Sequence, residues 1–235
     1  MRMNRSALVL EVIVCTVADA IEAAQGGADR LEVISHFEIG GLTPPLELVR
    51  AIQSAVQLPL RVMLRERDGY QISGIAEVER LCSAAREIAA LNVDGVVLGF
   101  LRDGNVDIET TQRILDSAPS LKATFHRAFD EASDPFQALA DLSRCKQIDR
   151  VLTSGSSGDW VDKAERLMRY QRAANGRPII LVGGGVDASV IKTLCETTTL
   201  AEFHIGRAAR IPPDFNGSVQ SARVKHILSV AVEYD

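Results

Sequence analysis

The chain has 235 residues, of which 46% are hydrophobic and 24% are charged, and its formal net charge is −5. This composition is typical of a folded globular protein and excludes a disordered or fibrous chain. The net negative charge, with Lys and Arg spread along the chain, argues against a surface for nucleic acid or for an anionic membrane. A small molecule or a metal ion is therefore the expected partner. No stretch approaches the ~20 apolar residues of a membrane span.

The first half of the chain alternates apolar runs with amphipathic segments. The run from Ala7 to Cys15 predicts a strand covered on both faces, and Thr16 with Asp19 is a capping-box pattern opening a helix that ends at Gly26-Gly27. This N-terminal run contains the charged residue Glu11 and has no small-residue cleavage pattern, so it is not expected to be a signal peptide. Further strands are expected at 30–35, 60–65 and 95–100. Helices are expected from Thr43-Pro44, over 75–88 and after Asp107.

The same alternation continues to the end of the chain. Strands are expected at 122–126, 151–154, 179–182 and 203–205. Helices are expected after Asp134-Pro135, over 160–168, after Asp187 and over 224–231. Eight strands that alternate with helices, with no linker between them, predict one α/β domain over 1–235, a (β/α)₈ TIM barrel, ahead of an open doubly wound sheet.

The four cysteines, Cys15, Cys82, Cys145 and Cys195, form no Cys-x-x-Cys pair. Neither a zinc site nor a disulfide framework is indicated. Cys82 and Cys195 fall on the apolar stripes of predicted helices, so both are expected to be small buried hydrophobic residues. A cytoplasmic location is the default expectation for such a chain.

Charged residues interrupt several of the predicted strands. Because strand side chains alternate between faces, the parity of each strand assigns these charges to the barrel interior, where opposite charges can pair. The residues so assigned are Glu11, Glu32, Arg61, Arg65 and His204. Two interpretations remain open for them. One is an internal salt-bridge network of Glu11, Glu32, Arg61 and Arg65. The other is a functional site at the carboxyl ends of the strands.

The segment Thr124 to Asp130, Thr-Phe-His-Arg-Ala-Phe-Asp, closes one strand and enters a turn. His126, Arg127 and Asp130 therefore lie on a strand-to-helix connection, where barrels carry their active sites. His126 is a candidate acid or base, and Arg65, Arg67 and Arg127 are candidates for holding negative charge. Ser154 and His204 also follow strands at this end. A half-buried surface strand would show the same alternation, and that interpretation stays open.

Glycines follow the last two predicted strands. Gly183-Gly184-Gly185 leads into the helix capped by Asp187, and Gly206-Arg207 follows the eighth strand. Glycine permits close backbone approach, and amides at a helix start favour an anion. We therefore predict an anion site contacted by Gly184, Gly185 and Gly206, with Arg207 beside them. The alternative is a simple turn in which Asp187 occupies the amides.

Several of these segments together resemble one known family. The chain is similar to the CutC family of copper homeostasis proteins over most of its length, through 26–32, 40–44, 94–97, 124–130, 152–155, 183–185 and His204. The resemblance implies a cytoplasmic TIM barrel linked to copper tolerance, often described as copper-binding, with no agreed reaction. The residues it carries over are Cys15, Glu32, Arg65, Arg67, His126, Arg127, Asp130, Thr153, Ser154 and His204.

The chain also departs from the family pattern. Ile34 stands where relatives often carry a cysteine, and the run from Arg65 to Tyr70 differs from the usual one. Loss of this thiol weakens a paired-cysteine site for Cu(I), which prefers soft ligands, and leaves Cys15 with His126 or His204 as the candidate copper site. Three functions stay open: a copper-linked protein, an enzyme for a small anionic or phosphorylated metabolite, and a barrel with a purely structural polar lumen. A homo-oligomer also stays open.

Overall fold

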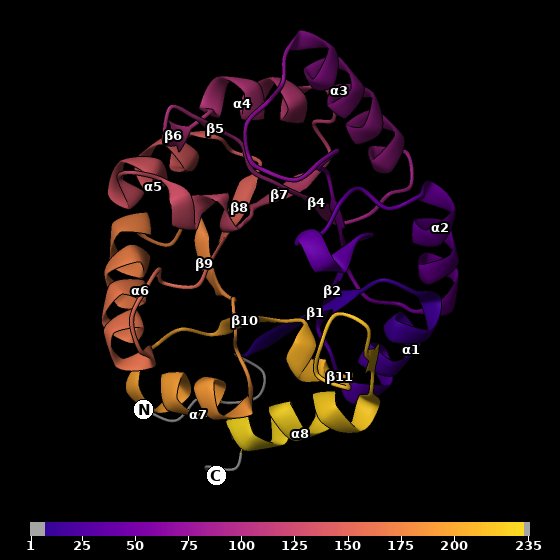
Figure 1. The fold of residues 1–235 in the computed structure, drawn as a ribbon, viewed down its shortest axis with the longest axis vertical. Coiled ribbons are helices and arrows are strands. Elements are labelled where there is room, and N and C mark those ends of the chain that lie inside the picture. Colours follow the sequence, from indigo (N-terminus) through magenta and orange to yellow (C-terminus); the bar gives the residue numbers. More distant parts are fainter. Residues whose placement is uncertain (1–7, 233–235) are drawn as a thin grey trace.

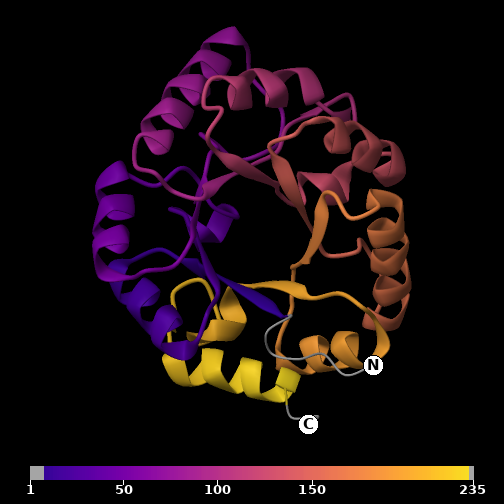
Figure 2. The same cartoon turned by 180° about the vertical axis from the view of Figure 1, so that it is seen from behind.

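The computed structural model describes residues 8–232, so Ala7, the predicted start of the first strand, lies outside the described part. Over these residues eight parallel strands close into a barrel in the order β1-β10-β9-β8-β7-β4-β3-β2, and α-helices surround it (Figure 1). Figure 2 shows the same closed ring from behind. The predicted TIM barrel is confirmed.

The barrel strands are short and the helices between them are amphipathic. The strands are β1 (Val9–Val14), β2 (Arg30–Val33), β3 (Leu60–Met63), β4 (Gly95–Leu98), β7 (Lys122–Phe125), β8 (Ile148–Thr153), β9 (Ile179–Val182) and β10 (Glu202–Ile205). The helices are α1 (Val17–Gly26), α2 (Leu46–Ala55), α3 (Ile75–Ala89), α4 (Ile108–Asp116), α5 (Pro135–Arg144), α6 (Trp160–Ala174), α7 (Ala188–Thr197) and α8 (Ser221–Val232). No helix over residues 8–232 combines the length and apolar character needed to cross a membrane.

Side-chain caps begin most of the predicted helices. Asp107, Asp134 and Asp187 each accept a backbone N–H in the first turn of the following helix, as predicted. The predicted start of α2 at Thr43-Pro44 is wrong, because α2 begins at Leu46. Pro45 disfavours the helical conformation for Pro44, so the helix cannot begin before it.

The capping box predicted for α1 is only half formed. Thr16 accepts from the N–H of Asp19, as expected, but the Asp19 carboxylate accepts from the N–H of Cys15 instead of closing on Thr16. It also pairs with Arg210 and accepts from the N–H of Val219. Asp19 therefore ties the start of α1 to the C-terminal segment of the barrel.

The period-two assignment of the strands is confirmed. Leu8, Leu10, Val12 and Val14 pack in the main core between strands and helices. The opposite face of the strands builds a small separate apolar layer inside the barrel, formed by Ile13, Ile34, Met63 and Val97. The lumen is thus filled by side chains at this level, as in other small barrels.

A continuous network of ion pairs fills the amino end of the lumen. It links, in order, Glu11, Arg30, Glu202, Arg150, Asp149, Arg61, Asp94 and Lys122. Within this network each Asp and Glu contacts two basic side chains, or one basic side chain and His204, so their charges are compensated where burial would otherwise be costly. The predicted network of Glu11, Glu32, Arg61 and Arg65 is therefore half right: Glu11 and Arg61 belong to it, whereas Glu32 and Arg65 do not.

Short segments cover the carboxyl end of the barrel. They are η2 (Phe37–Ile39), the strand pair β5 (Leu101–Arg102) and β6 (Asn105–Val106), η3 (Arg127–Glu131), η4 (Arg207–Ala209), and the pair β11 (Arg210–Ile211) and β12 (Ser218–Val219). In Figure 1 the violet turn after β2 and the yellow segment that carries β11 lie inside the ring of helices. The rings of Phe37 and Phe215 join these two segments edge to face, with 5.1 Å between centroids.

Candidate active site at the carboxyl end of the barrel

A cavity of about 720 Å³ is bordered by η2, η3, η4 and the segment between β11 and β12. This volume is within the usual range for a small-molecule site. Nine of the residues singled out from the sequence line it: Glu32, Arg65, His126, Arg127, Gly184, Gly185, His204, Gly206 and Arg207. Cys15, Arg67, Asp130, Thr153 and Ser154 do not appear in its lining.

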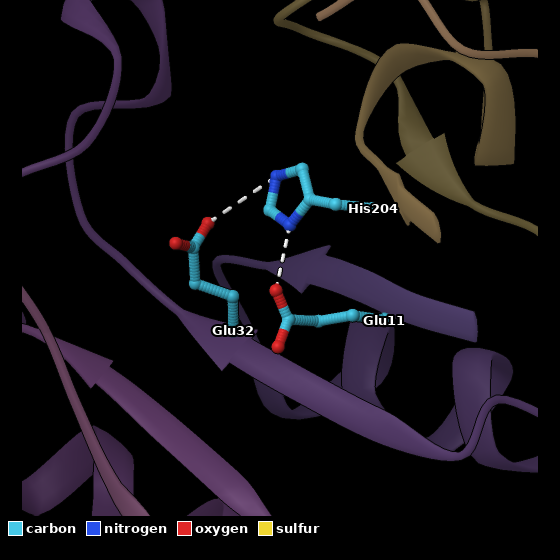
Figure 3. Close-up of side chains that lie close together, drawn as sticks. All are labelled: Glu11, Glu32 and His204. Atoms are coloured by element: carbon cyan, nitrogen blue, oxygen red, sulfur yellow. Dashed lines mark hydrogen bonds and ion pairs between the residues drawn. The ribbon is translucent and has the colours of Figure 1, made fainter. Parts of the chain in front are cut away.

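Glu11, His204 and Glu32 form the most deeply buried polar cluster of the site (Figure 3). The register of the barrel brings them together, because Glu11 lies opposite His204 and Ile13 lies opposite Glu32. His204 Nδ1 is 2.7 Å from Glu11 Oε1, and His204 Nε2 is 3.7 Å from Glu32 Oε2. The imidazole is thus held between two carboxyl groups that come from neighbouring strands.

The two carboxyl groups have opposite electrostatic surroundings. Burial alone would raise the pKa of Glu11, but Arg30 and His204 outweigh it and hold that pKa well below its ordinary value. Burial also raises the pKa of Glu32, and the negative charge of Glu11 raises it further. The positive charges of His204 and Arg30 lower it by less than this, so the pKa of Glu32 is about 7. One carboxyl group is therefore a permanent anion, and the other exchanges a proton near neutral pH.

The two carboxyl groups favour the protonated form of His204. Burial opposes a charge on the imidazole, but the carboxyl groups of Glu32 and Glu11 outweigh it and raise the pKa of His204 above its ordinary value. Glu32 accepts no hydrogen bond from any residue in the described part of the chain, and its carboxyl group lines the cavity. The proton of Glu32 is therefore available to a ligand, whereas the Nδ1–H of His204 donates a hydrogen bond to Glu11.

His126 has a different chemical character. Its Nδ1 accepts a hydrogen bond from the N–H of Ala128 at 3.2 Å, which places the imidazole proton on Nε2. Burial, reinforced by the positive charges of Arg65 and Arg127, lowers the pKa of His126 to about 3. Nε2 is buried and has no hydrogen-bond partner in the described residues. At neutral pH His126 is a neutral donor and not a proton acceptor.

Gly99 and Tyr70 determine how closely the His126 ring is held. A Cβ on Gly99 would lie 2.5 Å from His126 Nδ1, so only glycine leaves room for the ring there. The centroid of the His126 ring also lies 5.1 Å from that of the Tyr70 ring, over which the guanidinium of Arg65 stacks. The orientation of His126 is therefore fixed by packing as well as by its hydrogen bond.

Asp130, Thr153 and Ser154 act together behind the cavity wall. The Asp130 carboxylate pairs with Arg127 Nε at 3.0 Å and accepts hydrogen bonds from both hydroxyls and from the N–H of Ser154. This connects η3 to the end of β8 and positions Arg127 at the cavity. These three predicted site residues thus support Arg127, and they do not face the ligand space.

The two arginines after β3 have structural partners. Arg65 donates to the carbonyl oxygens of Ile39, Gly41 and Gly69 and pairs with Asp68, so it ties two loops together at the cavity wall. The Arg67 side chain is 49% exposed and pairs with Glu77 at the start of α3. The sequence grouped them as charges of one site, but only Arg65 lines the cavity.

The glycine loops have the backbone that their sequence predicts. Gly184 and Gly185 have φ of +81° and +90°, and a Cβ on Gly184 would lie 2.8 Å from that of Ser154. Asp187 caps α7 through the N–H of Val190 and accepts from the hydroxyl of Ser189. The cap thus takes one of the amides at the start of α7, so this helix start contributes little to an anion site.

The residues present do not fit Cu(I). Burial raises the pKa of Cys15 to about 11, so its thiol is protonated, and Arg210 lies 3.7 Å from its sulfur. Cys82 and Cys145 are buried elsewhere, and Cys195 is half-buried and not fully buried as predicted. Among the described residues, the one cluster of three with metal-ligand character is Glu11, Glu32 and His204, with ligand atoms within 4.8 Å of one another. Cu(I) prefers thiolate and thioether ligands, which this cluster lacks.

Some lining residues could not be identified from the sequence. Phe37, Met63, Tyr70 and Phe215 read as ordinary packing residues, and Arg223 reads as a surface position of the last helix. No local motif marks Arg223, because it reaches the cavity only through the packing of α8 against η4.

Comparison with known proteins gives a consistent result. A model of the CutC family matches residues 8–209. A family protein CutC of Xanthomonas axonopodis is 35% identical over 93% of this chain and 97% of its own length. A copper homeostasis protein cutC homolog of Homo sapiens is 34% identical over 83% of this chain and 72% of its own length.

Solved structures agree on the fold. The crystal structure of the putative copper homeostasis protein CutC from Streptococcus agalactiae superposes with a TM-score of 0.78, at 24% identity, over 85% of this chain and 98% of the other. Phosphoribosyl anthranilate isomerase from Thermococcus kodakaraensis superposes with a TM-score of 0.65 at 11% identity, over 95% of this chain and 98% of the other. At such identities these likenesses concern the fold alone.

Proposed function

The chain belongs to the CutC family, and from this membership we propose that it serves copper homeostasis as a cytoplasmic acid–base enzyme for a small metabolite. In this proposal it does not carry Cu(I) itself. The single observation that supports it most is Glu32, a buried carboxyl group that lines the cavity, accepts no hydrogen bond in the described chain and has a pKa of about 7. Titratable groups perturbed in this way are concentrated at functional sites.

The proposed reaction class is proton transfer on the substrate. Glu32 takes or gives the proton, because a group with a pKa near the working pH is the most effective general acid or base. His204, kept cationic between Glu11 and Glu32, stabilises negative charge that develops beside Glu32. The unpartnered Nε2–H of His126 donates to an oxygen of the substrate, and Arg127 adds positive charge to the same cavity.

The test uses deuterium exchange, which can be applied before the substrate is identified. The protein is incubated in D₂O with a panel of small metabolites, and loss of individual proton signals is followed by NMR. A substrate should exchange a proton with the parent and at least 100-fold more slowly with Glu32→Gln, as expected for loss of a general base. A matched variant is Glu38→Gln, an exposed carboxyl group that lines the same cavity.

The protonation state of Glu32 provides a second measurement. In protein labelled with ¹³C at glutamate carboxyl groups, one resonance should titrate near pH 7 and disappear in Glu32→Gln, whereas that of Glu11 should not titrate between pH 4 and 9. A Glu32 resonance that titrates near pH 4.5 would remove the basis of the proposal.

Direct copper binding is the competing function, and it has its own test. Competition for Cu(I) against a chelator of known affinity is measured for the parent and for Cys15→Ser. We expect weak or substoichiometric binding, because the Cys15 thiol is protonated and lies outside the cavity lining. Tight stoichiometric binding that Cys15→Ser abolishes would favour the copper carrier.

A further inference from the structure

We propose that the outer part of this cavity binds a phosphate group through Arg207 and Arg223, so that the ligand is a small phosphorylated metabolite. This inference rests on the proposed function for the assignment of the reactive end to Glu32. It adds a second anchoring point that the acid–base cluster does not provide, and it identifies the chemical class of the ligand.

The pairing of the arginines distinguishes two groups in the cavity lining. Arg65 is paired with Asp68, and Arg127 is paired with Asp130. By contrast, within the described chain neither Arg207 nor Arg223 forms a salt bridge or donates a side-chain hydrogen bond, and Arg223 Nε is buried without a partner. A buried donor without a partner costs free energy that an anionic ligand would recover.

The two arginines without an ion-pair partner in the described chain come from segments that a backbone hydrogen bond joins. Arg207 begins η4, and the N–H of Gln220 donates to the carbonyl of Ala209 at 2.9 Å, which fastens the end of η4 to the start of α8. Arg223 lies in the first turn of α8 and its N–H donates to the carbonyl of Gln220. Both side chains then line the same cavity.

The surroundings of these arginines favour a large anion. The Arg207 guanidinium stacks on the ring of Phe215, 5.4 Å from its centroid, which limits its freedom before a ligand arrives. Gly185 lines the same cavity, and a Cβ on it would meet no described atom within 4 Å, so this part of the wall is open. Besides Glu32, the carboxylates that line the cavity are Glu38, which is exposed, and Asp187, which already caps α7.

Two guanidinium groups suit a dianion better than a single carboxylate. Each presents a planar fork of N–H donors that matches the oxygens of phosphate, and two forks can share its two negative charges. The cavity of about 720 Å³ leaves room for the remainder of a small metabolite to reach Glu32 and His126. The expected ligand therefore has a phosphate at one end and a proton-exchanging group at the other.

The experiment measures thermal unfolding of the full chain with inorganic phosphate, with acetate and with chloride at equal ionic strength. A ligand that binds only the folded state raises the melting temperature by mass action, by about 3 to 6 °C at ten times its dissociation constant. Phosphate should give such an increment, and acetate and chloride should not. Arg207→Met and Arg223→Met, which keep most of the apolar stem, should each abolish it.

Two matched controls separate the site from a general loss of positive charge. Arg169 is also exposed and stacked on a phenylalanine, Phe136, outside the cavity, so Arg169→Met is the control for Arg207. Lys225 lies on α8 two residues beyond Arg223 and does not line the cavity, so Lys225→Met is the control for Arg223. Both controls should keep the phosphate increment, and broadening of the ³¹P signal of phosphate checks binding without heating.

The outcomes distinguish this inference from the proposed function. An equal response to all three salts, or a phosphate increment that survives in Arg207→Met and Arg223→Met, would overturn the phosphate site. If phosphate binds as expected but Glu32 titrates near pH 4.5, the phosphate site stands and the acid–base proposal fails. If phosphate has no effect while Glu32 titrates near pH 7, only the phosphate site is lost.

Discussion

His204 Nδ1 lies 2.7 Å from Glu11 Oε1 because the two residues are direct neighbours in the register of β10 and β1, where the barrel closes. Arg30 reaches Glu11 from the other side, on β2. One carboxylate thus joins the ion-pair network of the amino end to the reactive cluster at the carboxyl end. Contacts of this kind beyond the reacting groups fix the tautomer and orientation of a histidine.

The first prediction concerns Glu11→Gln. Removing the carboxylate leaves Arg30 and His204 buried with less compensation, so the free energy of unfolding should fall by about 3 to 5 kcal/mol, as for other broken buried ion pairs. The pKa of His204 should fall as well. Urea denaturation and NMR titration of the imidazole measure both effects. A loss below about 1 kcal/mol would contradict the central position given to Glu11.

The second prediction is that Glu32→Gln stabilises the protein at alkaline pH. The pKa of Glu32 is about 7 in the folded protein against 4.5 for an ordinary glutamate, so the folded state binds more protons between these values. The contribution of Glu32 to stability is fully present below pH 4.5 and is lost as pH rises to 7. At pH 8 the variant should therefore be more stable by up to about 3 kcal/mol.

Denaturation of the parent and of Glu32→Gln at pH 5 and pH 8 measures this difference. The advantage of the variant should be much smaller at pH 5, where the parent keeps most of its Glu32 contribution. Such a cost is expected of a residue kept for function and not for stability. An equal effect at both pH values would indicate a packing change instead.

The third prediction concerns acid stability and His126. The pKa of His126 is about 3 in the folded protein, against 6.5 for an ordinary histidine. Between these pH values the imidazole is protonated in the unfolded state and neutral in the folded state. The contribution of His126 is fully present above pH 6.5 and is lost as pH falls toward 3, by up to about 1.4 kcal/mol per pH unit. His126→Asn keeps an acceptor for the N–H of Ala128 and should remove this part of the pH dependence.

Urea unfolding at a series of pH values from 7 to 4 gives the slopes. His36, an exposed histidine outside the cavity lining, provides the control: His36→Asn should keep the slope of the parent. If His126→Asn and the parent lost stability in parallel, the acid sensitivity would have to come from the carboxyl groups alone.

The fourth prediction concerns Gly99→Ala. The added methyl group would lie 2.5 Å from His126 Nδ1, so the ring must move and the free energy of unfolding should fall by about 1 to 3 kcal/mol. A double-mutant cycle identifies the cause. In a His126→Ala background the same substitution should cost less by about 1 kcal/mol or more, and additive effects would show that the His126 ring is not the obstacle.

Strand parity was sufficient to predict much of the architecture and the buried part of the site. Glu11, Glu32 and His204 were assigned to the barrel interior because a two-residue period leaves only that face for a charge among apolar neighbours. Parity does not say which interior charges meet across the lumen. Arg30, Arg150 and Glu202 complete the network through pairing registers that a single sequence does not encode locally.

Loops and helix starts were harder to predict. Arg65 and Arg67 read as equivalent charges after one strand, yet Arg65 holds two loops at the cavity while Arg67 pairs with Glu77 outside it. Asp130, Thr153 and Ser154 were predicted at the site, and they lie just behind it because Asp130 satisfies both hydroxyls. The sequence does not mark Arg223 as a site residue, because a polar position on the last helix does not show which loop that helix packs against.

The ion-pair network occupies the amino end of the lumen, and none of the residues that form it lines the cavity. Stability and ligand contact are therefore carried by opposite ends of the same eight strands. Substitutions in the segments that cover the mouth can change which molecule is accepted while the charge-paired base still closes the barrel. Substitutions at the mouth can therefore change the substrate while the interactions that stabilise the fold stay intact.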